Sequence, residues 1–172
     1  MSKTQRLLGV RPEVAGRNAG GLISAKILCA EYNYMSKFPR PRTGAKAAGL
    51  RFEKQVVKSL EQKYSGFISG IPFQYKTEYA DKVICIPDGF LLYGKEIIVI
   101  EIKLRHTIDA WFQLRKLYSP VLQKVFSRPV RMMEICKVYE PGVVFPERIL
   151  ILKDVREFLT SKEEMGVLLW PR

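Results

Sequence analysis

Apolar residues recur at helical spacing over residues 45–64. Leu50, Val57 and Leu60 form one stripe, so this segment is predicted to be an amphipathic helix. Glu53 falls on the same stripe. A carboxylate on an apolar helix face carries a desolvation cost unless it meets a cation or hydrogen-bond donors. Glu53 is therefore either an acid of a metal site or the buried partner of an ion pair.

The pattern changes from helical spacing to short strands further along the chain. Two apolar runs, 90–93 and 96–100, are separated only by Gly94-Lys95, which is typical of a β-hairpin with a two-residue turn. Pairing Tyr93 with Glu96 then fixes the register of the two strands. The second run is apolar on both faces, which indicates a central strand of a sheet.

Counting outward from the turn places Asp88 directly opposite Glu101. Two opposed carboxylates repel each other unless one is protonated or a cation lies between them. Lys103 falls on the same face as Glu101, because strand side chains alternate with a period of two. The hairpin therefore predicts two acids and one lysine around a metal ion, in an arrangement suited to phosphodiester cleavage.

The remaining segments complete a pattern of strands and helices of the α/β (α+β) class. Thr107 is expected to cap a helix that runs to about residue 118, with Pro120 starting a second turn or kinking the first. Residues 22–32 are compatible with a further helix. Strands are expected at 67–74, 83–86, 130–139, 148–152 and 167–170, and a short helix at 154–162.

Length and composition favour a single domain. The chain has 172 residues, 47% of them apolar, enough for a core without disulfides. Residues 1–44 are predicted to form a basic N-terminal extension and 45–172 the catalytic core. The three cysteines indicate a reducing compartment. No apolar run is long enough for a signal peptide core or a membrane span, so we expect a soluble, intracellular protein, in a prokaryotic or phage-infected cell by analogy.

The formal net charge of +12 indicates a polyanionic partner, and nucleic acid is the first candidate. A membrane is disfavoured, because no lysine-studded amphipathic helix with a bulky apolar face is evident. The linker over 38–44 carries Arg40 and Arg42, which either follow a phosphate backbone or belong to a solvated arm.

Three blocks in order along the chain resemble the motifs of the PD-(D/E)XK nuclease superfamily, in its branch of RecB-type nuclease domains and lambda-type exonucleases. They are Gly49-Leu50-Arg51-Phe52-Glu53, Pro87-Asp88 and Glu101-Ile102-Lys103. RecB-type domains also tend to have a glutamine followed four residues later by a tyrosine. Here Tyr118 follows Gln113 by five residues, which departs from that pattern.

The resemblance implies a restriction-endonuclease-like core, in which a central mixed sheet is flanked by helices, and hydrolysis of DNA with Mg²⁺ or Mn²⁺. Asp88, Glu101 and the backbone carbonyl of Ile102 would bind the metal ion. Lys103 would stand beside the attacking water, and Glu53 would hold a water of the metal ion or a second ion. Gln113 would position the water or a phosphate oxygen.

Arg51, Arg105, His106, Arg115 and Lys116 are the further candidates for nucleic-acid contacts, although a histidine in this position more often caps or packs. We expect a metal-dependent deoxyribonuclease, with exonuclease action favoured. The alternatives are a structure-selective endonuclease of the junction-resolvase type, a non-catalytic DNA-binding module on a nuclease fold, and, more weakly, an RNA endonuclease.

Overall fold

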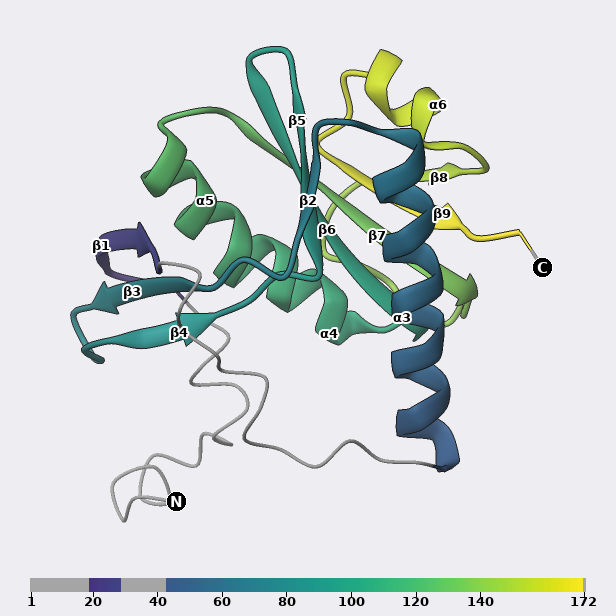
Figure 1. The fold of residues 1–172 in the computed structure, drawn as a ribbon, viewed down its shortest axis with the longest axis horizontal. Coiled ribbons are helices and arrows are strands. Elements are labelled where there is room, and N and C mark those ends of the chain that lie inside the picture. Colours follow the sequence, from purple (N-terminus) through teal and green to yellow (C-terminus); the bar gives the residue numbers. More distant parts are fainter. Residues whose placement is uncertain (1–18, 29–42, 172) are drawn as a thin grey trace.

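The computed structural model describes residues 19–28 and 43–171 (Figure 1). None of the helices in this part of the chain is long and apolar enough to cross a membrane. The strands are β1 Leu22–Ile27, β2 Phe67–Ser69, β3 Phe73–Thr77, β4 Val83–Cys85, β5 Gly89–Tyr93, β6 Glu96–Arg105, β7 Val130–Val138, β8 Leu150–Leu152 and β9 Met165–Leu169. The helices are α3 Gly44–Lys63, α4 Ile108–Trp111, the π-helical segment η2 Phe112–Tyr118, α5 Ser119–Phe126 and α6 Val155–Thr160.

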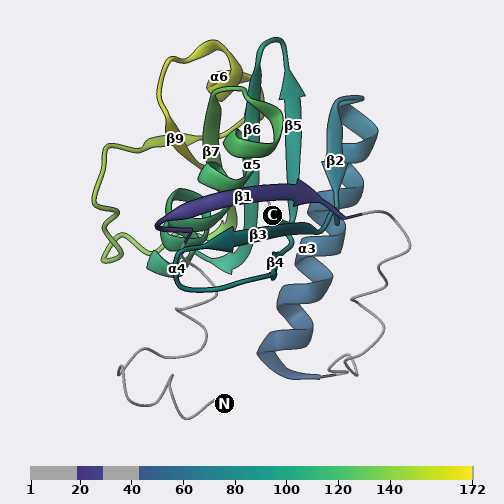
Figure 2. The same cartoon turned by 90° about the vertical axis from the view of Figure 1, so that its left-hand side faces the viewer.

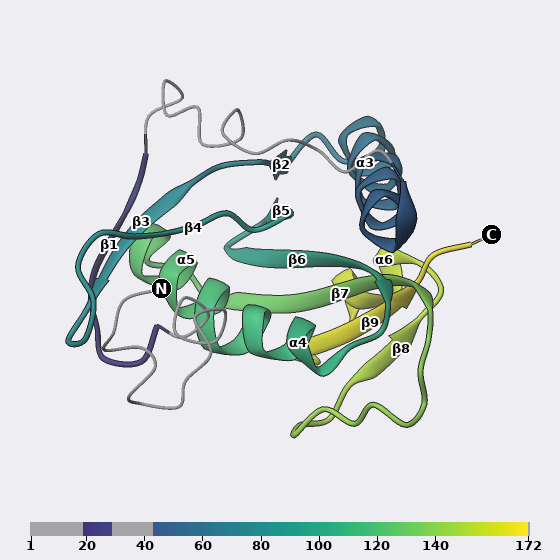
Figure 3. The same ribbon diagram turned by 90° about the horizontal axis from the view of Figure 1, so that it is seen from below.

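A six-stranded mixed sheet forms the centre of the fold, in the order β2-β5-β6-β7-β9-β8. Strands β2, β5 and β6 are antiparallel neighbours, whereas β6, β7, β9 and β8 are parallel. Figure 3 shows α3 above this sheet and the α4–α5 segment below it. The predicted mixed sheet flanked by helices is thus confirmed.

The hairpin between β5 and β6 has the register that its turn predicts. Tyr93 pairs with Glu96, and the pairing continues to Gly89 opposite Ile100. Gly94 has a φ of 58°, a left-handed conformation that glycine adopts without steric cost. A local turn therefore sets which residues of β5 and β6 face each other.

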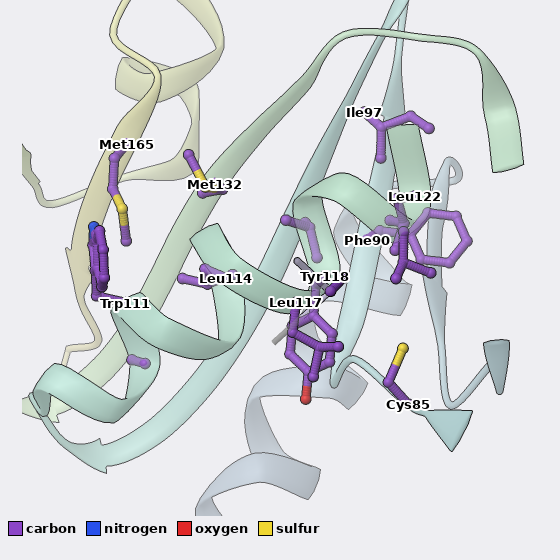
Figure 4. Close-up of a cluster of buried hydrophobic side chains, with 14 of the residues drawn as sticks. Cys85, Phe90, Ile97, Trp111, Leu114, Leu117, Tyr118, Leu122, Met132 and Met165 are labelled. Carbon is purple, nitrogen blue, oxygen red and sulfur yellow. The ribbon is translucent and has the colours of Figure 1, made fainter. Parts of the chain in front are cut away.

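Alternation along β6 divides its side chains between two cores. Ile98, Ile100 and Ile102 pack with α3 and α6, whereas Ile97 and Val99 pack with the α4–α5 segment. Figure 4 shows the second core, with the helical side chains between the strands. Glu101 and Lys103 continue the odd-numbered series and so lie on the α4–α5 face of the sheet.

The helix predicted to run from Thr107 to about residue 118 continues to Phe126. Its middle section, η2, is π-helical. Pro120 follows it as the second residue of α5, and because the helix continues through this position, the missing N–H of Pro120 removes one helical hydrogen bond beside the irregular section. Trp111 and Leu114 are buried, as their spacing predicts. The π-helical section changes which residues share a face of the helix.

The helix predicted over 22–32 is wrong for its described part. Residues 22–27 form β1, which pairs antiparallel with β3, because the strand pairing outweighs a weak local helical preference. Buried Ala19 donates its N–H to the carbonyl of Lys116 at 2.7 Å. The boundary predicted at 44/45 therefore does not separate an arm from the fold at residues 19–28.

A second, smaller sheet has the order β1-β3-β4 and faces the viewer in Figure 2. The single strand predicted over 67–74 is two strands, β2 and β3, interrupted at Gly70, whose φ is 66°. Phe73 and Tyr75 of β3 are buried in the core beneath this sheet. The end of β4 leads within three residues to Asp88, so the small sheet adjoins the predicted metal site.

Candidate active site

Asp88 lies directly before β5, one position outward from the last hairpin pair, Gly89 and Ile100. Its Oδ2 accepts a hydrogen bond from the backbone N–H of Ile102 at 2.6 Å. Its carboxyl group also lies against that of Glu101, close enough for a shared proton to join them. The two acids therefore face each other, as the hairpin register predicts.

Glu101 is almost completely buried, with 2% of its surface exposed. Its Oε1 forms an ion pair with Nζ of Lys103. Its Oε2 is buried and meets no hydrogen-bond donor among the described residues. A buried carboxylate oxygen without a hydrogen-bond donor destabilises the folded state. Binding of a proton or a cation to this atom would remove that cost.

Burial, followed by the charge of Glu101, raises the pKa of Asp88 well above that of an ordinary aspartate. Burial also raises the pKa of Glu101, and Lys103 opposes that shift. Without a cation, the pair therefore retains a proton under conditions in which exposed carboxyl groups are ionised. A divalent cation between the two groups would replace this proton and would remove the repulsion.

The backbone of Ile102 adds a third oxygen. In an extended strand, the N–H and the C=O of one residue point to the same side. Because the N–H of Ile102 points to Asp88, its carbonyl oxygen also faces the side of β6 on which Asp88 lies. Two carboxylates and one carbonyl fit Mg²⁺, which typically takes one or two carboxylates and completes its shell with water and phosphate oxygens.

Glu53 approaches the same acids from α3. Its side chain is half-buried, and its charge contributes to the raised pKa of Glu101, after burial. Within residues 19–28 and 43–171, no three His, Cys, Asp or Glu side chains are grouped so that they could hold a metal ion by themselves. The position of Glu53 fits a residue near the metal-binding pair better than a third direct ligand.

Gln113 and Tyr118 lie together on the helix below the acids. Nε2 of Gln113 donates to the hydroxyl of Tyr118 at 3.3 Å, and this hydroxyl donates to the carbonyl of Ile86 at 3.4 Å. A π-helix makes i→i+5 hydrogen bonds, so a residue and its fifth successor share a face. The five-residue spacing that departs from the RecB-type pattern is therefore accommodated by η2.

The buried Oε1 of Gln113 meets no partner among the described residues. The charges of Glu101 and Asp88 act on the hydroxyl of Tyr118, whose pKa is raised chiefly by burial and further by these two groups. Both helical side chains thus lie close to the acids. Figure 4 shows Tyr118 beside Leu117, near Cys85.

His106 is not available for a nucleic-acid contact, and that prediction is corrected. The residue is 1% exposed, its Nδ1 lies 2.6 Å from Glu134 and its Nε2 lies 3.2 Å from the carbonyl of Val143. The ring stacks on Tyr139, with centroids 4.8 Å apart. Both ring nitrogens thus already face acceptors within the protein. The residue packs in the interior, where its contact with Val143 ties down the chain after β7.

The predicted basic contacts differ in their surroundings. Arg115 is tied to Glu147 and Glu164, so it supports the fold around Trp111. Arg105 pairs with Glu140 at the surface. Arg51 and Lys116 are exposed, Lys116 with its ammonium 5.4 Å from the ring of Trp111. Two further candidates lie outside the described residues, namely Arg40 and Arg42.

Glu134 is a residue of the site that sequence reasoning missed. It pairs in register with Glu101 on the neighbouring strand β7, is fully buried and helps to raise the pKa of Glu101, after burial. An acid in the middle of the otherwise apolar run 132–136 was the available signal. It is the same kind of signal that identified Glu53.

The site thus combines two opposed acids, a lysine and a glutamine from three neighbouring segments of the fold: the residue before β5, strand β6 and the π-helical segment η2. Comparison of the sequence with protein-family models and with curated proteins, and of the structure with solved structures, gives no match.

Proposed function

We propose that the protein is a metal-dependent deoxyribonuclease with a restriction-endonuclease-like core, a member of the PD-(D/E)XK superfamily. The observation that carries this proposal is the opposition of Asp88 and Glu101 with Lys103 paired to Glu101. Burying two acids against each other is unfavourable unless a cation or a proton lies between them. Such an arrangement is expected where binding of a cation compensates for it.

Asp88, Glu101 and the carbonyl of Ile102 would hold Mg²⁺ or Mn²⁺, since hard cations select oxygen ligands. Bound there, a divalent cation supplies Lewis-acid polarisation of a phosphate oxygen and lowers the pKa of a water molecule. The apolar residues behind the acids, including Ile100 and Val99, keep the local dielectric low and strengthen these electrostatic interactions.

Lys103 supplies a positive charge on the same face as Glu101. With 28% of its side chain exposed, its ammonium is partly desolvated yet accessible from solvent. It can stabilise the negative charge that develops on the phosphate oxygens, and it can orient an attacking water molecule by donating a hydrogen bond to it. Such a donor can contribute about 10²–10³ in rate.

Gln113 and Glu53 would orient the reacting groups. The Oε1 of Gln113, which meets no partner among the described residues, is an acceptor for a water proton, and the amide nitrogen of Gln113 is held by Tyr118. Glu53 would accept hydrogen bonds from water on the α3 side of the acids. Tyr118 acts through Gln113, and the carbonyl of Ile86 holds the hydroxyl of Tyr118 in place, so Tyr118 is a positioning residue.

DNA is the proposed substrate, because the chain has a formal net charge of +12 and the site suits phosphodiesters. The test is incubation of purified protein with linear, circular, single-stranded and branched DNA in Mg²⁺, Mn²⁺ or EDTA, beside Glu101→Gln. Cleavage of linear but not circular DNA supports exonuclease action, and selective cleavage of branched DNA supports a resolvase. Metal-independent cleavage, or retained cleavage by Glu101→Gln, would overturn the proposal.

A further inference from the structure

The outer face of the small sheet carries a groove of about 340 Å³. Six polar side chains line it from β1, β3 and the β3–β4 turn: Ser24, Lys26, Gln74, Lys76, Asp81 and Lys82. None of them belongs to the candidate active site. The groove is therefore a separate feature of the surface.

Strand alternation explains why these residues face solvent. Phe73 and Tyr75 of β3 are buried, so Gln74 and Lys76 between and after them point outward. In the register of the sheet, Ser24 lies opposite Lys76. The polar face is thus continuous across neighbouring strands, which are about 4.8 Å apart.

The groove is positively charged. Three lysines line it against one carboxylate, Asp81, which is 2.8 Å from Lys76; three positive charges and one negative charge leave +2. Lys26 and Lys82 are exposed, and neither forms an ion pair within the described part of the chain. Flexible ammonium groups spread over a shallow surface favour binding of the regularly spaced phosphates of a nucleic-acid backbone. Such contacts do not select a base sequence.

The groove lies within reach of the active site along the chain. Lys82 and Asp88 are six positions apart, so their Cα atoms lie at most about 20 Å from each other. This distance corresponds to about six base-pair steps of B-DNA at 3.4 Å each. A duplex bound at the acids is long enough to contact both places.

We propose that this groove binds the phosphodiester backbone of DNA whose scissile phosphate lies at Asp88 and Glu101. The inference rests on the proposed nuclease function, and it assigns substrate binding to the β1-β3-β4 sheet. Lys26 and Lys82 supply the contacts, while Lys76 stays paired with Asp81.

The test uses the full chain with Lys26→Gln and Lys82→Gln combined, which leaves the Lys76–Asp81 pair intact. Lys153→Gln with Lys162→Gln is the matched control, because both lysines are exposed and flank α6 at the other end of the molecule (Figure 1). Binding of a fluorescent linear duplex is measured by anisotropy in EDTA over a series of salt concentrations. The slope of log K against log salt should fall by about 2 in the groove variant, and stay unchanged in the control.

An unchanged slope in the groove variant, with a wild-type melting temperature, would overturn the inference. The same result in both variants would also overturn it, because the effect would then reflect total charge. Cleavage in Mg²⁺ separates this outcome from failure of the nuclease proposal. A wild-type protein that cleaves no DNA, but whose binding still depends on the groove lysines, retains the binding surface and loses the catalytic function.

Discussion

The backbone N–H of Ile102 donates to Asp88 at 2.6 Å and holds this carboxyl group against Glu101. This hydrogen bond joins residues 14 positions apart and ties the start of β5 to the part of β6 that extends beyond the hairpin. It favours the ionised form of Asp88, but burial and Glu101 outweigh it. Without a cation, the two carboxyl groups therefore either keep a proton or repel each other.

Asp88→Asn should stabilise the metal-free protein, and more so as the pH rises. An asparagine accepts from Ile102 and donates to Glu101 without charge. A raised carboxyl pKa means that the folded state holds a proton that the unfolded chain releases above about pH 4, so wild-type stability falls as the pH rises towards the folded pKa. The gain should be about 2–8 °C at pH 8, about 1–2 kcal/mol, and smaller at pH 5.

Thermal melting in EDTA at the two pH values measures this effect. Asp81→Asn is the matched control, because Asp81 is exposed and its pKa is lowered by its hydrogen bond and ion pair with Lys76. A gain from Asp88→Asn that is equal at both pH values would contradict the shared proton.

Mg²⁺ or Mn²⁺ should stabilise the wild-type protein more at pH 8 than at pH 5. The carboxylates must lose their proton to bind a cation, and a ligand at 100 times its dissociation constant adds about 2.7 kcal/mol. Melting curves with and without metal would show the shift, and Glu101→Gln should abolish it. A metal shift of equal size in this variant would place the cation elsewhere.

Gln113→Ala and Tyr118→Phe should slow cleavage through one shared interaction. Because Tyr118 acts by holding Gln113, we expect each change to cost about 10-fold in single-turnover rate, with little change in DNA affinity. The double variant should be no slower than Gln113→Ala alone, because residues that act as a unit are non-additive. Fully multiplicative effects would separate the two residues.

Gly89→Ala should destabilise the protein beside the site. A Cβ at this position would lie 2.4 Å from the ring of Phe67 and 3.1 Å from the carbonyl oxygen of Ile68, which is overpacking of about 1–3 kcal/mol. Adding Phe67→Leu should recover part of the loss in denaturant melts. Gly142→Ala is the control, since nothing lies within 4 Å of its added Cβ. Equal stabilities of the two alanine variants would contradict the close packing.

The arrangement of Asp88 and Glu101 could be predicted because it depends on local structure. The Gly94-Lys95 turn fixes the register, and each residue outward follows from alternation. Glu53 was likewise visible as an acid on an apolar stripe. The structure adds that the charge of Glu53 helps to raise the pKa of Glu101, and that no group of three such ligands for a metal ion forms within the described part of the chain.

Other parts of the site depend on contacts between distant residues and could not be read from the sequence. His106 meets Glu134 across 28 positions, and Arg115 meets Glu147 across 32. The first pairing buries His106, which therefore cannot contact DNA, and the second engages Arg115 in an ion pair within the fold. Strand β1 was missed for the same reason, since its partner β3 lies about fifty residues later.

The most direct test of the central claim is the single-turnover cleavage rate of Lys103→Met in Mg²⁺. Lys95→Met, in the exposed hairpin turn, is the matched control, and melting temperature and DNA affinity are measured for both. The structure predicts a loss of about 10²–10³ in rate for Lys103→Met, with DNA affinity retained, and a wild-type rate for Lys95→Met. Wild-type cleavage by Lys103→Met would contradict a catalytic site at Asp88, Glu101 and Lys103.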